Sequence, residues 1–358
     1  MKTFHCDQCG QQVFFENVLC ENCNGVLGYL PDHQVMGTFA LDHDGFWKGL
    51  NQAYANQRYR KCRNYAQEGV CNWMISAESD AQICASCELT QVIPALSTAR
   101  NRLYWRRMEA AKRRLLYTLW HLELRPVSKA RDRLRGIAFQ FLEDRPSKRV
   151  RMGHANGLIT LNVAEADPAQ RERIREQLGE PYRTLLGHFR HESGHYYFDR
   201  LVVNSHWHAP FRNLFGDERA PYSEALRNHY RKQQGGNRDP RFISSYASAH
   251  PWEDWAETWA HFLHMIDTLD TAYWCGMTVQ PKHAREPELV IPDQPLQLHS
   301  FEDMMAQWVA LTAVINSLNR SIGMPAPYPF NLSALARQKL RFVFDVLHEN
   351  RHGVSLPD

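Results

Sequence analysis

Residues 188–198 read His-Phe-Arg-His-Glu-Ser-Gly-His-Tyr-Tyr-Phe and contain the pattern HExxH at His191, Glu192 and His195. On an α-helix, residues four apart lie on the same face, so the two imidazoles can bind one metal ion. In metallopeptidases of this pattern, the glutamate accepts a proton from a water molecule that the metal activates. The pattern also arises by chance in helices that contain His and Glu. A catalytic metal site therefore requires a third ligand elsewhere in the chain.

Several acidic residues after the motif could supply that ligand and leave a fourth metal position open for water. Asp199 lies one helical turn beyond the motif, and Asp217 and Glu218 lie in a loop-like Gly-Asp-Glu. A metzincin would carry Gly at position 198 and His at position 201. The chain has Phe198 and Leu201 there, which excludes that class.

A stronger candidate lies in residues 251–261, Pro-Trp-Glu-Asp-Trp-Ala-Glu-Thr-Trp-Ala-His. The tryptophans recur at three- and four-residue steps, which predicts a helix with one broad apolar face, and Pro251 suits its first turn. Glu253 and Glu257 then point the same way along the edge of that face. We predict that Glu253 is the third ligand and that Glu257 holds a ligand imidazole by a hydrogen bond, which is the gluzincin arrangement. In the alternative, both glutamates face solvent.

Tyr246, Glu253 and Glu257 fall at the spacing found in the catalytic domain of anthrax lethal factor, which also has Gly before its second motif histidine, as does Gly194. Over nearly its full length the chain resembles a family of bacterial zinc-binding metallopeptidases with an N-terminal zinc ribbon. The shared stretches are the paired CxxC motifs, residues 191–197, residues 250–261 and residues 318–325. The resemblance implies a zincin-like α+β domain in which Tyr246 would bind the oxyanion of the reaction intermediate. In the alternative, Tyr246 is a core tyrosine.

Eight of the nine cysteines precede residue 88 and have spacings typical of metal sites. Two CxxC pairs, Cys6 with Cys9 and Cys20 with Cys23, predict one structural zinc site. A looser set, Cys62, Cys71, Cys84 and Cys87, predicts a second. The two sets could be used in sequence or interleaved as a cross-brace. The ninth cysteine, Cys275, is expected to be a buried free thiol.

The 358 residues suggest two domains, which we place at residues 1–90, a zinc-ribbon region with few regular elements, and residues 91–358, the metallopeptidase domain. Hydrophobic residues make up 44% and charged residues 23% of the chain, as in ordinary globular proteins. No apolar run is long enough for a membrane span, and the first residues lack the apolar stretch of a secretion signal. These features favour a cytoplasmic protein without a membrane partner.

A helix is predicted at residues 94–124, and one of its faces is basic. Residues 100–151 contain 16 Lys or Arg against 5 Asp or Glu, an excess of 11, whereas the whole chain has a net charge of only +3. The asymmetry could mark a docking face for nucleic acid or for an acidic protein. In the alternative, which we favour slightly, these cations pair with the acidic remainder of the same chain.

A small sheet is expected just before the HExxH helix. Ile137, Phe139 and Phe141 alternate with other residues, and Asn156-Gly157 is a favoured two-residue hairpin turn. Residues 157–163 are our candidate for the outer strand that would bind an extended substrate, with Thr160 and Asn162 as substrate-binding residues. In the alternative, this is an interior strand.

The other histidines and segments carry less information. His188 precedes the motif by one turn and is expected to support the site, while His206 and His208 could line the cleft. Residues 203–245 suggest a lid with one helix, and the helices predicted at 301–320 and 332–349 look like scaffold.

The sequence therefore predicts a zinc metalloendopeptidase with one catalytic and two structural zinc ions, acting on a peptide or protein substrate. Two other functions stay open. The ribbons and the basic helix could form a binding module for nucleic acid or a protein, with the zincin domain regulatory or inactive. The HExxH site could instead hydrolyse a non-peptide amide.

Overall fold

The computed structural model describes residues 1–145, 147–232 and 239–352. In its N-terminal part, β1 (Phe4–His5) and β2 (Gln12–Val13) form a short hairpin, and an antiparallel sheet follows in the order β3-β4-β5-β6-β7. These five strands are Val26–Leu30, Val35–Leu41, Trp47–Gly49, Arg58–Lys61 and Met74–Ser76. The expectation of few regular elements here is wrong. Most residues of β3 and β4 are buried on both faces, so the strands lack the alternation of apolar and polar residues that reveals a half-exposed strand.

A second, mixed sheet has the strand order β10-β11-β9-β8. The strands β8 (Thr90–Val92), β9 (Ala138–Leu142) and β11 (Leu158–Asn162) run parallel. The remaining strand, β10 (Gly153–Ala155), pairs antiparallel with β11 through the predicted turn. Asn156 and Gly157 have φ angles of +49° and +78°, which this type of hairpin turn requires.

The prediction that residues 157–163 form the outer strand is wrong, because β11 lies between β9 and β10. The hydroxyl of Thr160 accepts a hydrogen bond from Gln140 (2.6 Å), and the side-chain amide of Asn162 donates one to Asp144 (3.0 Å). Both predicted substrate-binding side chains thus serve the sheet region itself. The edge strand that contacts the HExxH helix is β10.

Helices make up most of the C-terminal part, and those predicted at residues 301–320 and 332–349 agree with the structure to within a few residues. Residues 203–245, where one helix was expected, contain two. The helices of this part are α4 (Pro168–Leu178), α5 (Leu185–Tyr197), α6 (His208–Phe215), α7 (Tyr222–Lys232), α8 (Pro251–Trp274), α9 (Phe301–Ser321) and α10 (Ala334–His352). Short turns occur at α1 (Arg63–Ala66), α2 (Ala85–Glu88), η1 (Val163–Ala166), η2 (Phe198–Val202), η4 (Tyr246–Ala249) and η5 (Pro295–Gln297). Within the described residues, no helix combines the length and hydropathy needed to cross a bilayer.

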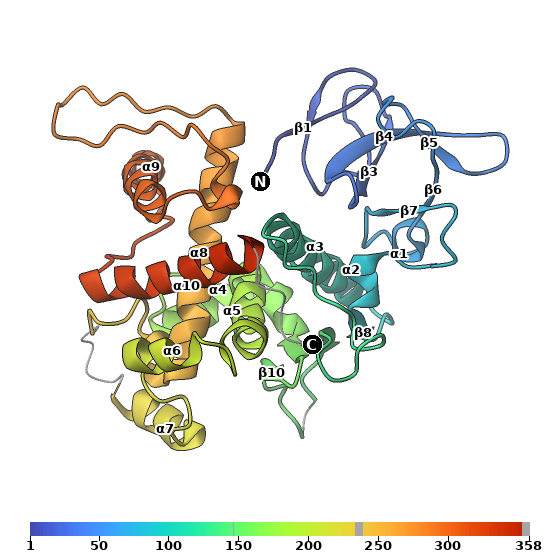
Figure 1. Cartoon of the computed structure of the whole chain (residues 1–358). Coiled ribbons are helices and arrows are strands. Elements are labelled where there is room, and N and C mark those ends of the chain that lie inside the picture. The colour runs from blue at the N-terminus through green and yellow to red at the C-terminus, as the bar shows by residue number, and fades with distance from the viewer. Residues whose placement is uncertain (146, 233–238, 353–358) are drawn as a thin grey trace.

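The long helix α3 (Ala99–His121) lies between the N-terminal sheet and the C-terminal helices (Figure 1). Two cations of its predicted basic face are buried rather than exposed. The ammonium of Lys112 pairs with Glu109 (2.8 Å), and the guanidinium of Arg113 donates to the carbonyl oxygen of Val70 (2.7 Å). These side chains therefore belong to the interior.

Other cations of α3 bind the N-terminal part of the chain. Arg102 forms an ion pair with Glu68, and Arg114 forms one with Glu16. Much of the basic helix face is therefore paired within the molecule, as the alternative interpretation of the charge excess expects.

Candidate active site

The helices α5 and α8 pack closely where the HExxH motif lies. At Gly194, a Cβ atom would lie 3.0 Å from Cα of Ala256 and 3.1 Å from Cδ1 of Trp259, so a side chain here would crowd the contact between the helices. The indole N–H of Trp255 donates to the carbonyl oxygen of Gly194 (2.8 Å), and that of Trp259 donates to Oγ of Ser193 (3.1 Å). The tryptophans of the apolar face thus also hold α8 against the motif.

The three predicted metal ligands meet at this helix contact. Oε2 of Glu253 lies 2.9 Å from Nε2 of His191 and 3.4 Å from Nε2 of His195. The three donor atoms lie within 4.8 Å of one another. Glu253 is only 1% exposed, yet its Oε2 makes no hydrogen bond of normal geometry. A buried carboxylate oxygen without a donor, facing two imidazole nitrogens, fits a bound zinc ion.

Glu257 orients the ring of His191. Its Oε1 lies 2.7 Å from Nδ1 of His191, and its Oε2 accepts a hydrogen bond from the hydroxyl of Ser244 (2.5 Å). Burial raises the pKa of Glu257, but these hydrogen bonds and nearby histidine charges outweigh it and lower the pKa to about 2. The charged carboxylate favours a proton on Nδ1, which leaves the lone pair of Nε2 directed toward a metal.

Glu192 lies beside the ligand set and is 7% exposed. Its Oε2 has no hydrogen-bond partner, and burial raises the pKa of its carboxyl group. A carboxylate with a free lone pair and a raised pKa is suited to accept a proton from water near neutral pH.

Tyr246 lies on the same side of the site. Its ring centroid is 5.8 Å from that of His191, and the half-buried side chain lines the cavity in front of Glu192. Burial raises the pKa of Tyr246, so its hydroxyl keeps the proton and can donate a hydrogen bond.

One site residue, Tyr222, was not singled out from the sequence. It is the first residue of α7, and its hydroxyl donates to Oε1 of Glu253 (2.6 Å). This bond occupies one carboxylate oxygen and leaves the other, Oε2, to the histidines. The predicted helix at 222–232 could be found from the sequence, but no local spacing relates Tyr222 to a glutamate 31 residues later.

The other acidic and histidine candidates lie outside the group of donor atoms that the described residues place around His191 and His195. Most of them have another partner: Asp217 pairs with Arg219, Glu218 with His208, His188 with Glu165, and His206 with Glu349. His188 lines the cavity next to the site, whereas His206 and His208 do not. Asp199 follows His195 by one turn and also lies outside the donor group.

A cavity of about 400 Å³ opens in front of the site. His191 and Glu192 line it together with three aromatic side chains, those of Tyr182, Tyr328 and Phe330. The volume is within the range of small-ligand pockets and leaves room for one or two side chains of a peptide.

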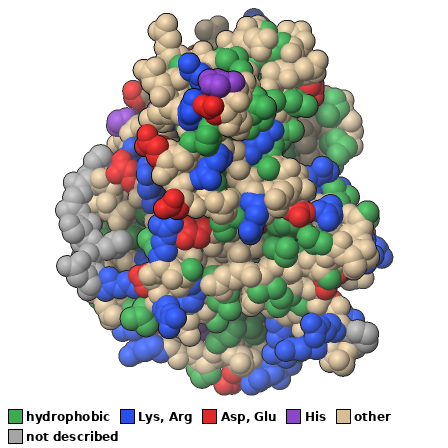
Figure 2. All heavy atoms as spheres, turned by 90° about the vertical axis from the view of Figure 1, so that its right-hand side faces the viewer, with side chains coloured by type: hydrophobic (Ala, Val, Ile, Leu, Met, Phe, Trp, Pro, Cys, Tyr) green, Lys and Arg blue, Asp and Glu red, His purple; other side chains and the backbone are tan. Residues whose placement is uncertain are grey.

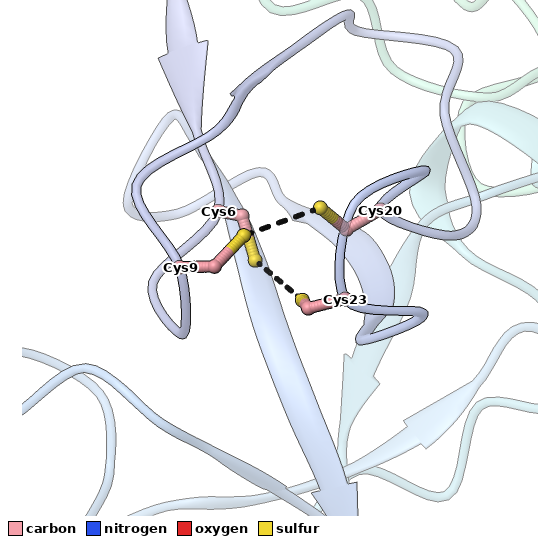
Figure 3. A group of neighbouring side chains, drawn as sticks. All are labelled: Cys6, Cys9, Cys20 and Cys23. Atoms are coloured by element: carbon pink, nitrogen blue, oxygen red, sulfur yellow. Dashed lines mark hydrogen bonds between the residues drawn. The ribbon is translucent and has the colours of Figure 1, made fainter.

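The eight N-terminal cysteines form two groups of four, and Figure 3 shows the first of them. In that group, the sulfur atoms of Cys6 and Cys23 lie 3.6 Å apart, as do those of Cys9 and Cys20. A tetrahedral site with zinc–sulfur bonds of about 2.3 Å places its sulfurs about 3.8 Å apart, whereas a disulfide needs about 2 Å. The geometry therefore fits zinc rather than a disulfide.

The second group contains the remaining four predicted ligands, Cys62, Cys71, Cys84 and Cys87. The sulfurs of Cys71 and Cys84 lie 3.7 Å apart. The two groups use the cysteines in sequence order, so the cross-braced alternative is excluded. The expectation for Cys275 is wrong: it is exposed, because it caps the C-terminal end of α8 at the surface.

Arg113 of α3 lies beside the second cysteine group. Burial lowers the pKa of its guanidinium, but the negative charges of Cys71, Glu109, Cys87 and Cys84 outweigh it and raise the pKa. A zinc ion with four thiolates carries two net negative charges, and a buried cation balances part of that charge.

We expect Arg113→Met to lower the free energy of unfolding by about 3 kcal/mol, because it leaves buried negative charge uncompensated. Arg106→Met is the matched control on the exposed side of the same helix, and its effect should stay within about 0.5 kcal/mol. Urea unfolding of the zinc-loaded proteins measures both values. Equal effects in the two variants would contradict this role of Arg113.

Comparison with known proteins gives two family matches. A family model described as "Putative zinc-binding metallo-peptidase" matches residues 101–346, and one described as a zinc-ribbon domain matches residues 3–98. Uncharacterized proteins of Mycobacterium bovis and Mycobacterium tuberculosis are 40% identical to the chain over 351 residues, which cover 98% of this chain and 96% of each relative. No solved structure matches the chain.

Proposed function

Because the chain belongs to the zinc-binding metallopeptidase family whose model covers residues 101–346, we propose that it hydrolyses peptide bonds of a protein substrate. The observation that carries this proposal is the convergence of His191, His195 and Glu253 within 4.8 Å beside the buried Glu192. Three protein ligands leave a coordination position free, which distinguishes a catalytic zinc site from a closed structural one. With the two cysteine groups, we propose three zinc ions per chain.

His191, His195 and Glu253 would hold the catalytic ion, with Glu253 bound through Oε2 because Tyr222 occupies Oε1. The ion would supply Lewis acidity, which polarises a carbonyl group and lowers the pKa of a water molecule. Glu192 would take a proton from that water molecule and pass it to the leaving nitrogen atom.

Tyr246 would donate a hydrogen bond to the oxygen of the tetrahedral intermediate. Its ring lies next to that of His191, and its hydroxyl stays protonated, so the donor is in place before the reaction.

An extended substrate would pair with the edge strand β10 rather than with β11. The strand β10 is one of the two edge strands of the sheet, and it contacts α5, which carries the motif. Met152, immediately before β10, lines the catalytic cavity. A peptide added to this edge would therefore run toward Glu192.

The experiment is a digest of a denatured protein mixture with the full chain, followed by mass spectrometry of new termini, including those of the chain itself. We expect cleavage that 1,10-phenanthroline stops and that added zinc restores, because a site with three protein ligands and an open position releases its ion more readily than a site closed by four thiolates. Cleavage that persists after removal of all zinc would contradict the proposal, as would the absence of any new terminus.

A further inference from the structure

A groove of about 1090 Å³ lies at the mixed sheet, and none of its described lining residues also lines the catalytic cavity. One wall is formed by residues 92–95 at the end of β8, and the other by residues 148–151 before β10. Neither wall contains a residue of the proposed catalytic machinery. The groove is therefore a separate feature that hydrolysis of a peptide bond does not explain.

Four exposed cations, Arg145, Lys148, Arg149 and Arg151, line this groove. Among the described residues, none of the four side chains has an ion pair or a side-chain hydrogen bond, in contrast to Arg102 and Arg114 of α3. Of the 16 cations between residues 100 and 151, these four gather in one groove without internal partners. Unpaired like charges repel one another, and an anionic partner would relieve that repulsion.

Two carboxylates also line the groove, but both are already occupied. Glu143 accepts a hydrogen bond from the side chain of Asn101 (2.8 Å). Asp144 accepts bonds from the backbone N–H of Val150 (2.7 Å) and from Asn162 (3.0 Å). They brace the loop and keep their negative charges, so the described lining of the groove has four cations against two carboxylates, an excess of two positive charges.

The groove also has an apolar part. Val92 and Ile93 are each 40% exposed, and Pro94, Phe141 and Leu142 lie next to them. Exposed aliphatic side chains favour contact with the apolar side chains of a peptide. Single-stranded nucleic acid would instead need exposed aromatic rings for base stacking, and Phe141, the one aromatic side chain among the described lining residues, is buried.

The groove adjoins the route toward the catalytic cavity. Arg151 lines the groove and the next residue, Met152, lines the cavity. Figure 2 shows the face that carries the N-terminal sheet, with Lys and Arg side chains gathered toward its lower end and hydrophobic side chains between them. A chain segment in the groove could therefore belong to the same molecule that enters the cavity.

We propose that this groove binds an acidic segment of the protein substrate, with Asp or Glu side chains on the four cations and apolar side chains on Val92 and Ile93. The proposal rests on the proposed function, because it assigns the bound segment to the substrate. It predicts that proteins with an acidic, aliphatic stretch near an extended region are selected for cleavage.

The test is fluorescence anisotropy with a fluorescein-labelled peptide of alternating Glu and Leu residues, added to the full chain. We expect Arg149→Gln/Arg151→Gln to weaken binding at least about fivefold, since two charge contacts are lost, and Val92→Ser/Ile93→Ser to weaken it as well. The matched control, Lys282→Gln/Arg285→Gln, makes the same change in net charge at exposed residues of another region and should bind like the wild type. Binding should also weaken as salt is raised from 50 to 500 mM.

Equal weakening in the control pair would show that net charge alone attracts the peptide, and it would overturn the proposal. Tighter binding of a single-stranded oligonucleotide, lost in Arg149→Gln/Arg151→Gln, would overturn it in favour of a nucleic-acid surface. The binding assay requires no hydrolysis, so Glu192→Gln should bind the peptide like the wild type. If the peptide does not bind, the proposal for the groove fails while the proposal of zinc-dependent hydrolysis is unaffected. If hydrolysis is absent, the peptide can still bind in the groove.

Discussion

Glu192→Gln should reduce peptide-bond hydrolysis by at least about 10²-fold, and up to about 10⁴-fold, while three zinc ions stay bound to each chain. The amide has nearly the shape of the carboxylate but cannot accept the proton of a water molecule. Glu192 is not among the three donor atoms of the site, so metal binding should not change. Turnover is measured on a cleaved peptide from the digest, and the metal content by plasma mass spectrometry.

The control for this variant is Glu172→Gln, which neutralises an exposed carboxylate on α4 that pairs with Arg175. It should retain full activity. A Glu192→Gln protein that turns over within about tenfold of the wild type would show that another group accepts the proton.

Glu253→Ala should lose one of the three zinc ions and, with it, all hydrolysis. Removal of this carboxylate leaves two imidazoles as the only protein ligands, and it also deprives Tyr222 of its acceptor. The cysteine groups lie in the N-terminal part and should keep both of their ions. Titration with a chromophoric zinc chelator measures the number of ions and the affinity of each class.

Tyr222→Phe tests the hydrogen bond to Glu253 separately from metal binding by the Glu253 carboxylate. It keeps the carboxylate of Glu253 but removes the hydrogen bond to Oε1, so we expect all three ions to bind and the catalytic ion to bind about 10- to 100-fold more weakly. For Glu253→Ala, retention of three zinc ions with unchanged affinity would contradict the assignment of Glu253 as a metal ligand. A circular dichroism spectrum equal to that of the wild type establishes that the Glu253→Ala protein is folded.

The features best predicted from the sequence are those that depend on the spacing of residues close together in the chain. The motif histidines four residues apart, the tryptophans at three- and four-residue steps and the CxxC pairs each relate residues within a few positions, and local backbone geometry alone sets those relations. The α+β fold class, the helices around residues 191 and 253, and the cysteine groups could therefore be predicted. The family resemblance added Tyr246.

Residues far apart in the chain behave differently, because periodicity shows which face of an element is apolar but not which elements pack together. The burial of Lys112 and Arg113 depends on Glu109 and Val70, and only the packing of α3 against the N-terminal part brings that about. In the same way, β10 makes β11 an interior strand and removes Thr160 from the predicted substrate edge.

The sequence by itself determined which metal-binding and catalytic groups the chain contains: two imidazoles and a glutamate on one helix, two glutamates on another, and eight thiolates in two sets. Only the tertiary structure decided that Oε2 of Glu253 faces both histidines, that Tyr222 takes Oε1, and that four of the 16 cations lie in one groove without an ion-pair partner among the described residues. The physical reason is that local spacing sets the direction of a side chain relative to its own helix or strand. Its distance from a distant residue is set by how those elements pack, through contacts such as that of Gly194 with Ala256.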